Sequence, residues 1–156
     1  MFRRRPLAIA GAALAAGALA AVPIIPALGA QSNAVTKGPL FASMTGGAEA
    51  PTKGDSDGRG AATVLFPSPT KVCFALLVNN LKKPNAAHIH RGARGVAGPI
   101  AVPLTPPASG KGGAVSGCTT ASAALVSEIA SKPGGFYVNV HTADFPGGAI
   151  RGQLHK

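Results

Sequence analysis

The stretch Gly135-Phe136-Tyr137-Val138-Asn139-Val140-His141 decides the fold class of this chain. Its even-numbered side chains from 136 to 140 are apolar, whereas its odd-numbered ones are Tyr137, Asn139 and His141. Successive side chains on a β-strand point to opposite faces. The alternation therefore predicts a half-buried strand with one apolar and one polar face.

Short segments of the same kind recur along the chain, separated by turns rich in Gly, Pro, Asn and Asp. The predicted strands are 40–45, 61–66, 71–78, 87–90, 99–102, 135–141 and 149–154. One helix is predicted to be capped by Thr119 or Thr120 and to end at Ser131, before a Pro-Gly pair. Residues 105–113, rich in Pro and Gly, are predicted to be an exposed loop. This pattern predicts an all-β fold, an antiparallel β-sandwich or barrel with one short helix.

The amino terminus has the layout of a secretory signal. Arg3, Arg4 and Arg5 precede an apolar run that ends in small residues just before Gln31. We therefore predict a cleaved signal peptide over residues 1–30, a linker over 31–39 and one domain over 40–156. The predicted location is secreted or extracytoplasmic, at the cell envelope. The alternative is an uncleaved anchor, in which case the membrane is contacted only through this segment.

The chain is basic, with a formal net charge of +10. Twelve of its fifteen Lys and Arg residues lie after residue 30, and only Lys82 and Lys83 are adjacent there. Scattered charge with few aromatic side chains argues against a nucleic-acid partner. The expected partner is an unidentified extracellular protein or an anionic envelope polymer.

Cys73 and Cys118 are the only cysteines. An oxidising location favours one disulfide between them. Metal ligation by the pair is the alternative, but neither cysteine belongs to a Cys-x-x-Cys motif. The disulfide is therefore the prediction.

The histidines offer the chain's metal-binding chemistry. His88 and His90 are two residues apart, so on a strand both imidazoles point to one face. If the strand that carries His141 lies nearby, the three imidazoles could bind copper or zinc with one open position. Alternatively, the histidines bind nothing, or the polar face is a hydrogen-bond network that ties strands together.

Four motifs in order resemble the CHRD domain, a module named after chordin that also occurs alone in exported bacterial proteins. They are Ala87-His88-Ile89-His90-Arg91-Gly92, Gly98-Pro99-Ile100, Tyr137-Val138-Asn139-Val140-His141-Thr142 and Gly148-Ala149-Ile150-Arg151-Gly152-Gln153-Leu154. The resemblance covers about Leu40 to Leu154.

The resemblance implies an immunoglobulin-like sandwich or barrel, distantly similar to copper-zinc superoxide dismutase. On that view His88 and His90 match the paired copper ligands of that enzyme, and Arg151 matches its anion-guiding arginine. The segment from Arg91 to Gly135 contains no histidine for the enzyme's zinc site. The family brings no catalytic activity that could be transferred to this chain.

The sequence thus predicts an exported binding or structural module that is not an enzyme and requires no cofactor. The alternative is a copper-binding protein, or a zinc-binding one, that uses His88, His90 and His141. In that case Arg151 would attract an anion. Asp144 and Asn139 would lie next to the histidines and help to orient them. Otherwise Arg151 and Asp144 would form a surface ion pair. A third hypothesis is adhesion to anionic polymers through the basic surface.

Overall fold

The structure is a computed structural model that describes residues 38–156. The predicted signal peptide and most of the predicted linker fall on residues 1–37, outside the described residues. Among the described residues, no helix has the length and apolar character needed to cross a membrane.

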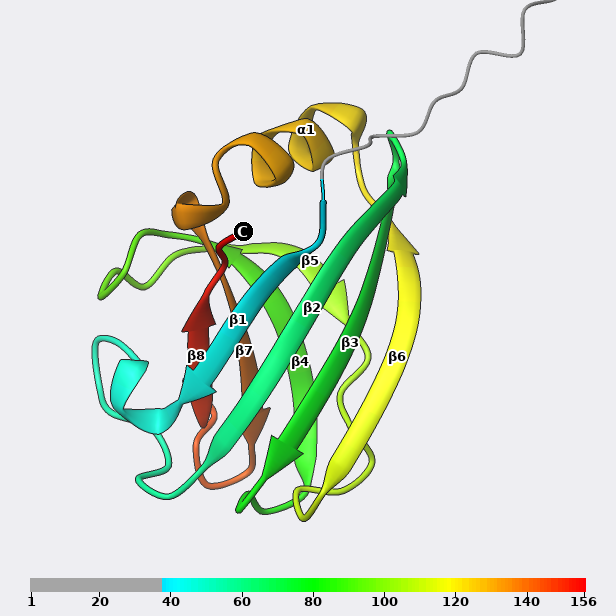
Figure 1. Cartoon of the computed structure of the whole chain (residues 1–156). Coiled ribbons are helices and arrows are strands. Elements are labelled where there is room, and N and C mark those ends of the chain that lie inside the picture. Colours follow the sequence, from blue (N-terminus) through cyan, green and yellow to red (C-terminus); the bar gives the residue numbers. More distant parts are fainter. Residues whose placement is uncertain (1–37) are drawn as a thin grey trace, which may run out of the picture. The chain divides into compact units, whose positions relative to one another are not determined.

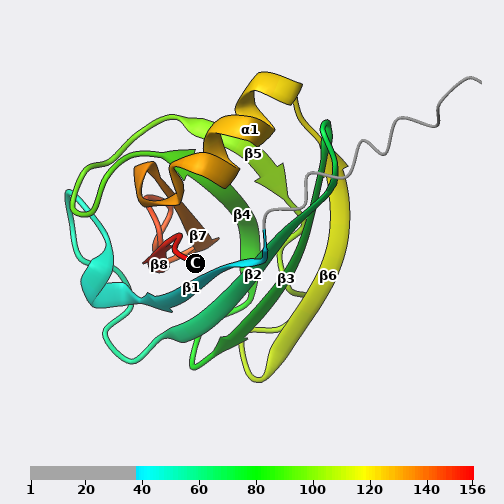
Figure 2. The same cartoon turned by 45° about the horizontal axis from the view of Figure 1, so that its top comes forward.

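Eight strands form one antiparallel sheet in the order β5-β4-β7-β8-β1-β2-β3-β6. The strands are β1 (Leu40–Thr45), β2 (Arg59–Ser68), β3 (Lys71–Asn79), β4 (Pro84–Arg91), β5 (Ile100–Leu104), β6 (Gly113–Thr120), β7 (Phe136–Thr142) and β8 (Ile150–Gln153). The sheet curves around a common interior and is nearly barrel-shaped (Figures 1 and 2). The all-β prediction is therefore confirmed.

The interior is filled by the apolar face of each strand. Buried and exposed positions alternate along β1 and β3, as the sequence pattern predicts. Ile89, Val138 and Ile150 are fully buried there, so the apolar faces of β4, β7 and β8 point inward. The polar side chains of these three strands consequently lie on the outer face of the sheet.

One helix, α1 (Ala123–Ser131), lies across one end of the barrel (Figure 2). It buries Val126 and Ile129 in the core. The prediction of a cap at Thr119 or Thr120 was wrong, because both residues belong to β6. The Ser122 hydroxyl caps the helix instead and accepts a hydrogen bond from the Leu125 amide at 3.3 Å.

The sequence did not predict β6. Its residues, Gly-Ala-Val-Ser-Gly-Cys-Thr-Thr, contain two glycines and few bulky side chains, so the strand signal is weak. The strand forms because it pairs with β3 along its whole length, from Lys71 opposite Thr120 to Val78 opposite Gly113. Cys73 and Cys118 face each other in this ladder and form the predicted disulfide, which is confirmed.

The segment from Thr105 to the start of β6 is a loop but is only partly exposed. Pro107 and Gly110 are buried, contrary to the prediction. Gly110 accepts a hydrogen bond from the Leu81 amide at 3.0 Å, and a Cβ at Gly110 would lie 2.2 Å from the Leu81 carbonyl oxygen. The loop therefore packs against the connection between β3 and β4.

Two loops cover the outer face of β4, β7 and β8. One is the β4–β5 connection, residues 92–99, and the other follows β1 and includes a short 3-10 helix, η1 (Gly46–Ala48). Side chains from the outer face reach both loops, as detailed below. The sheet thus has a second, polar layer outside the barrel core.

Candidate metal centre

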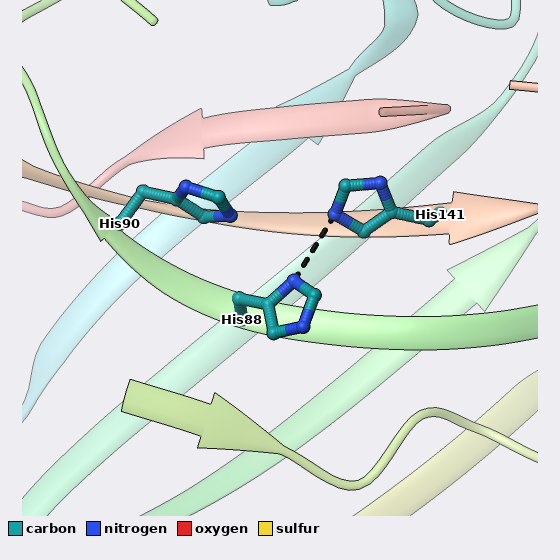
Figure 3. Close-up of side chains that lie close together, drawn as sticks. All are labelled: His88, His90 and His141. Atoms are coloured by element: carbon teal, nitrogen blue, oxygen red, sulfur yellow. Dashed lines mark hydrogen bonds between the residues drawn. The ribbon is translucent and has the colours of Figure 1, made fainter. Parts of the chain in front are cut away.

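The three histidines of the two distinctive motifs converge on this outer face (Figure 3). His88 and His90 come from β4, and His141 comes from β7. β4 and β7 pair so that Asn139 lies opposite His88 and Tyr137 lies opposite His90. The two strands are therefore neighbours, which is the condition on which the three-histidine hypothesis depends.

One ring nitrogen from each histidine lies within 4.8 Å of the others. His88 Nδ1 is 3.1 Å from His141 Nε2, and a ring nitrogen of His90 points toward His141 (Figure 3). Two nitrogens bound tetrahedrally to one ion at about 2.0–2.1 Å lie roughly 3.3 Å apart. Small side-chain rotations would therefore bring all three nitrogens to one metal ion.

Hydrogen bonds fix which nitrogen two of the rings present. His90 Nδ1 donates to the Gly98 carbonyl at 2.8 Å, and His141 Nδ1 donates to the Pro146 carbonyl at 2.9 Å. Each carbonyl only accepts, so Nδ1 carries the proton and Nε2 of the neutral ring carries the lone pair. His90 Nε2 is buried and has no hydrogen-bond partner, so it is an unused donor atom for a metal.

The electrostatics of the cluster favour neutral imidazoles. Burial, and then the neighbouring rings of His141 and His90, lower the pKa of His88 to about 4. Burial likewise lowers the pKa of His141. Neutral imidazole is the form that binds metal ions, so the cluster is held in a binding-competent state.

Tyr137 lies between His90 and Arg151. Its ring stacks on the His90 imidazole, with centroids 4.9 Å apart and an interplanar angle of 10°. The Arg151 guanidinium carbon lies 3.3 Å from the Tyr137 ring centroid. Because β7 lies between β4 and β8 in the sheet, the three side chains form a stack across three strands.

Arg151 is 1% exposed and donates from Nη2 to the Ala93 carbonyl at 2.7 Å. It therefore lies beneath the 92–99 loop and not at a solvent-facing entrance. The alternative of a surface pair with Asp144 was wrong, because Asp144 pairs with Lys82 at 2.7 Å. Among the described hydrogen bonds of the three histidines, none involves Asp144.

Asn139 adjoins the cluster directly. It is 2% exposed, and its Oδ1 lies 3.0 Å from His141 Nε2. The sequence predicts Asn139 as a neighbour of the histidines, and its side chain lies within hydrogen-bonding distance of His141.

Sequence reasoning missed Glu49, which lies in the loop after β1 and is only 4% exposed. Burial raises its pKa to about 7, although Arg151, the Ala50 backbone and the Asn139 side chain each lower it. A Cβ at Gly148 would lie 2.4 Å from a Glu49 carboxylate oxygen, so the turn before β8 leaves room for this side chain. The Pro-Gly-rich setting gave no signal that Glu49 is buried.

Comparison with known proteins assigns the chain to a family. The CHRD domain matches residues 40–154, from the start of β1 to just beyond β8. A search among curated proteins found no match. Since the CHRD domain spans well over half of the sequence, and its four motifs all lie within it, the chain belongs to the CHRD domain family.

Proposed function

We propose that this CHRD domain binds one transition-metal ion, copper or zinc, through His88, His90 and His141. The observation that carries the proposal is the convergence of three imidazole nitrogens from two strands within 4.8 Å. The buried, unpartnered Nε2 of His90 supports it, because such an atom has lost its hydrogen bonds to water and makes none within the protein. A metal ion would supply the missing partner.

Copper and zinc are the metals that suit this donor set. Neutral imidazole binds both, whereas calcium and magnesium prefer oxygen ligands. Backbone carbonyls orient two of the rings, as in many metal sites where the second ring nitrogen donates to the protein.

The proposed activity is binding and not turnover. The family and the barrel suggest a binding or structural module. The burial of Arg151 supports this, since a guanidinium covered by a loop cannot draw an anion from solvent to the metal. The metal would instead link β4 to β7. It would serve as a structural ion, or as an ion that the protein carries and delivers.

We further propose that the domain works outside the cytoplasm. The Cys73–Cys118 disulfide supports this location, because disulfides persist in oxidising compartments. A bound copper ion would then come from the extracytoplasmic medium.

Adhesion to an anionic polymer is a second proposal, carried by a different part of the surface. Lys82, Lys83 and Lys111 line one surface cavity of about 560 Å³. Such binding would weaken with salt and persist in histidine variants. A retention assay on a polyanion resin at low and high salt, with wild type and His88→Ala/His90→Ala, would separate it from metal binding.

Calorimetric titration of the purified, tag-free protein with Cu(II) and with Zn(II) tests the metal proposal. We expect one equivalent bound by the wild type and no saturable binding by His88→Ala/His90→Ala. His155→Ala is the matched control, because His155 is exposed and lies outside the cluster. Equal binding by the wild type and the double variant would overturn the proposal.

A further inference from the structure

We propose that Asn139 is a fourth protein ligand of this metal, through Oδ1, and that Glu49 is the positioning residue that orients its amide. The inference rests on the proposed function, since it needs a metal at the histidines. It goes further by defining a donor set of three nitrogens and one oxygen.

The register of the sheet places Asn139 beneath the cluster. Asn139 lies directly opposite His88 on the outer face, and His141 is the next residue on the same face of β7. Side chains so placed are neighbours in the sheet. At 2% exposure, the Asn139 amide is enclosed and must find its partners within the protein.

When the His141 ring is neutral, no hydrogen lies between His141 Nε2 and Asn139 Oδ1. His141 Nδ1 carries the hydrogen that it donates to the Pro146 carbonyl, so Nε2 presents a lone pair. Asn139 Oδ1, also a lone-pair atom, lies only 3.0 Å from it. Two acceptors at this distance repel unless a cation is shared between them, and a separation near 3 Å is typical of two ligands on one metal ion.

His88 presents a third atom at the same place. Its Nδ1 is 3.1 Å from His141 Nε2 and can donate a hydrogen to it in the metal-free protein. That hydrogen bond satisfies His141 but leaves Asn139 Oδ1 without a donor among the described hydrogen bonds. While the rings are neutral, no arrangement of hydrogens satisfies His88 Nδ1, His141 Nε2 and Asn139 Oδ1 together, whereas one metal ion can bind all three.

Glu49 explains why the oxygen of Asn139, and not its NH₂ group, faces the histidines. The Asn139 side chain is a hydrogen-bonding neighbour of the Glu49 carboxylate. A carboxylate accepts, so the amide turns its NH₂ toward Glu49 and its oxygen toward His141. Arg151, which also lies near Glu49, lowers the pKa of this carboxyl group, although burial raises it overall. Rotation of the amide would place NH₂ against a metal ion and leave two oxygens in contact at Glu49.

With Asn139 included, the protein ligands would cover the side of the metal ion that faces the barrel. His88 and His141 are half-buried, while His90 is only 8% exposed. Any remaining coordination position would therefore face solvent on the side of His88 and His141, away from His90.

Electron–nuclear double resonance on the Cu(II)-loaded protein, grown with asparagine labelled with carbon-13 at the side-chain amide, tests the inference. We expect a carbon-13 coupling in the wild type, because only a coordinated amide places that carbon two bonds from copper. Asn139→Ala should lose the coupling and bind Cu(II) about 10- to 100-fold more weakly. Asn85→Ala is the matched control on β4, where the side chain is exposed, and should keep both.

The outcomes separate the two proposals. A wild type that binds no metal at the histidines overturns the proposed function, and the ligand role falls with it. A wild type that binds copper there without a carbon-13 coupling overturns the ligand role alone, even if Asn139→Ala does not fold.

For Glu49, we expect Glu49→Gln to bind copper but to show the coupling in only a fraction of the protein, because Gln accepts either end of the Asn139 amide. A full coupling in Glu49→Gln would remove its positioning role.

Discussion

Arg151 combines full burial with a permanent charge. Its partners are the Ala93 carbonyl, the face of Tyr137 and the nearby carboxylate of Glu49. Removal of Arg151 would leave the Ala93 carbonyl without its donor, which costs about 1–3 kcal/mol for a buried group. Arg151 is thus a structural residue of the outer layer.

We predict that Arg151→Ala lowers the free energy of unfolding by about 1–3 kcal/mol, because the Ala93 carbonyl loses its donor and the 92–99 loop loses an anchor. Urea unfolding of the metal-free protein measures this. Arg94→Ala is the control, since Arg94 is exposed in the same loop and should change stability by less than about 0.5 kcal/mol. Equal effects of the two substitutions would show that Arg151 is not a buried anchor.

Glu49 makes the stability of the metal-free protein depend on pH. Burial raises the pKa of Glu49 from 4.5 to about 7 in the folded state. The folded protein therefore holds this proton more tightly than the unfolded chain does. The stabilisation is fully present below about pH 4.5 and is lost as the pH rises to about 7.

We predict that wild type loses on the order of 3 kcal/mol relative to Glu49→Gln between pH 4.5 and pH 7, at roughly 1.4 kcal/mol per pKa unit. The difference between the two proteins is the quantity to measure, by urea unfolding across this range. The lowered pKa of His88 gives the opposite slope in both proteins, because a depressed histidine pKa adds stability as the pH rises. Parallel pH profiles for the two proteins would contradict the prediction.

At the scale of the element, the 92–99 loop is held by side chains of the outer face. Gly98 accepts from His90 Nδ1 through its carbonyl and donates through its amide to the Tyr137 hydroxyl at 3.2 Å. Gln153 donates to the Gly92 carbonyl at 2.8 Å. The loop and the histidine cluster are therefore one hydrogen-bonded unit.

We predict that Gly98→Ala weakens both this loop and metal binding. A Cβ at Gly98 would lie 1.6 Å from the Arg91 carbonyl oxygen, so the backbone must move and His90 loses its anchor. Metal affinity should fall about 10- to 100-fold, as for other residues that orient a ligand, which calorimetric titration measures. Gly47→Ala is the control, because a Cβ there meets no atom. Unchanged affinity in Gly98→Ala would separate the loop from the site.

The disulfide joins β3 to β6, the strand with the weakest sequence signal. Its two cysteines are separated by 45 residues. We predict that Cys73→Ala/Cys118→Ala lowers the free energy of unfolding by about 2–4 kcal/mol, chiefly because the unfolded chain gains freedom. Urea unfolding measures the loss, and reduction of the wild type should reproduce it. A double variant as stable as the oxidised wild type would contradict this role.

The elements differ in how well the sequence predicted them. β1 was predicted with its observed bounds because its alternation is regular. β6 was missed because its pairing with β3, and not its own side chains, makes it a strand. The helix cap was placed two or three residues early, since Thr119 and Thr120 are as suitable for capping as Ser122 when their strand is not recognised.

At the scale of the whole molecule, the barrel brings together segments that are far apart in sequence. β4 and β7 are neighbours, so His88 and His141, 53 residues apart, come within hydrogen-bonding distance. The sequence predicted which histidines face outward, but their meeting depends on strand order. The burial of Glu49 and Arg151 could not be predicted, because it depends on two loops that fold over the outer face.

A metal that ties β4 to β7 should stabilise the entire fold. At a free-metal concentration 100 times the dissociation constant, binding adds about 2.7 kcal/mol. We predict that Zn(II) under this condition raises the Tm of the wild type by roughly 5–15 °C. Differential scanning calorimetry measures the shift, which should be absent in His88→Ala/His90→Ala. An equal shift in that variant would place the metal elsewhere.

The central claim is that one metal ion occupies the histidine cluster. A crystal structure of the Cu(II)-loaded protein, with anomalous data at the copper absorption edge, tests it most directly. We predict one strong anomalous peak bound by His88 Nδ1, His90 Nε2 and His141 Nε2. A peak at His155 or elsewhere on the surface, with the three histidines arranged as in the metal-free protein, would contradict it.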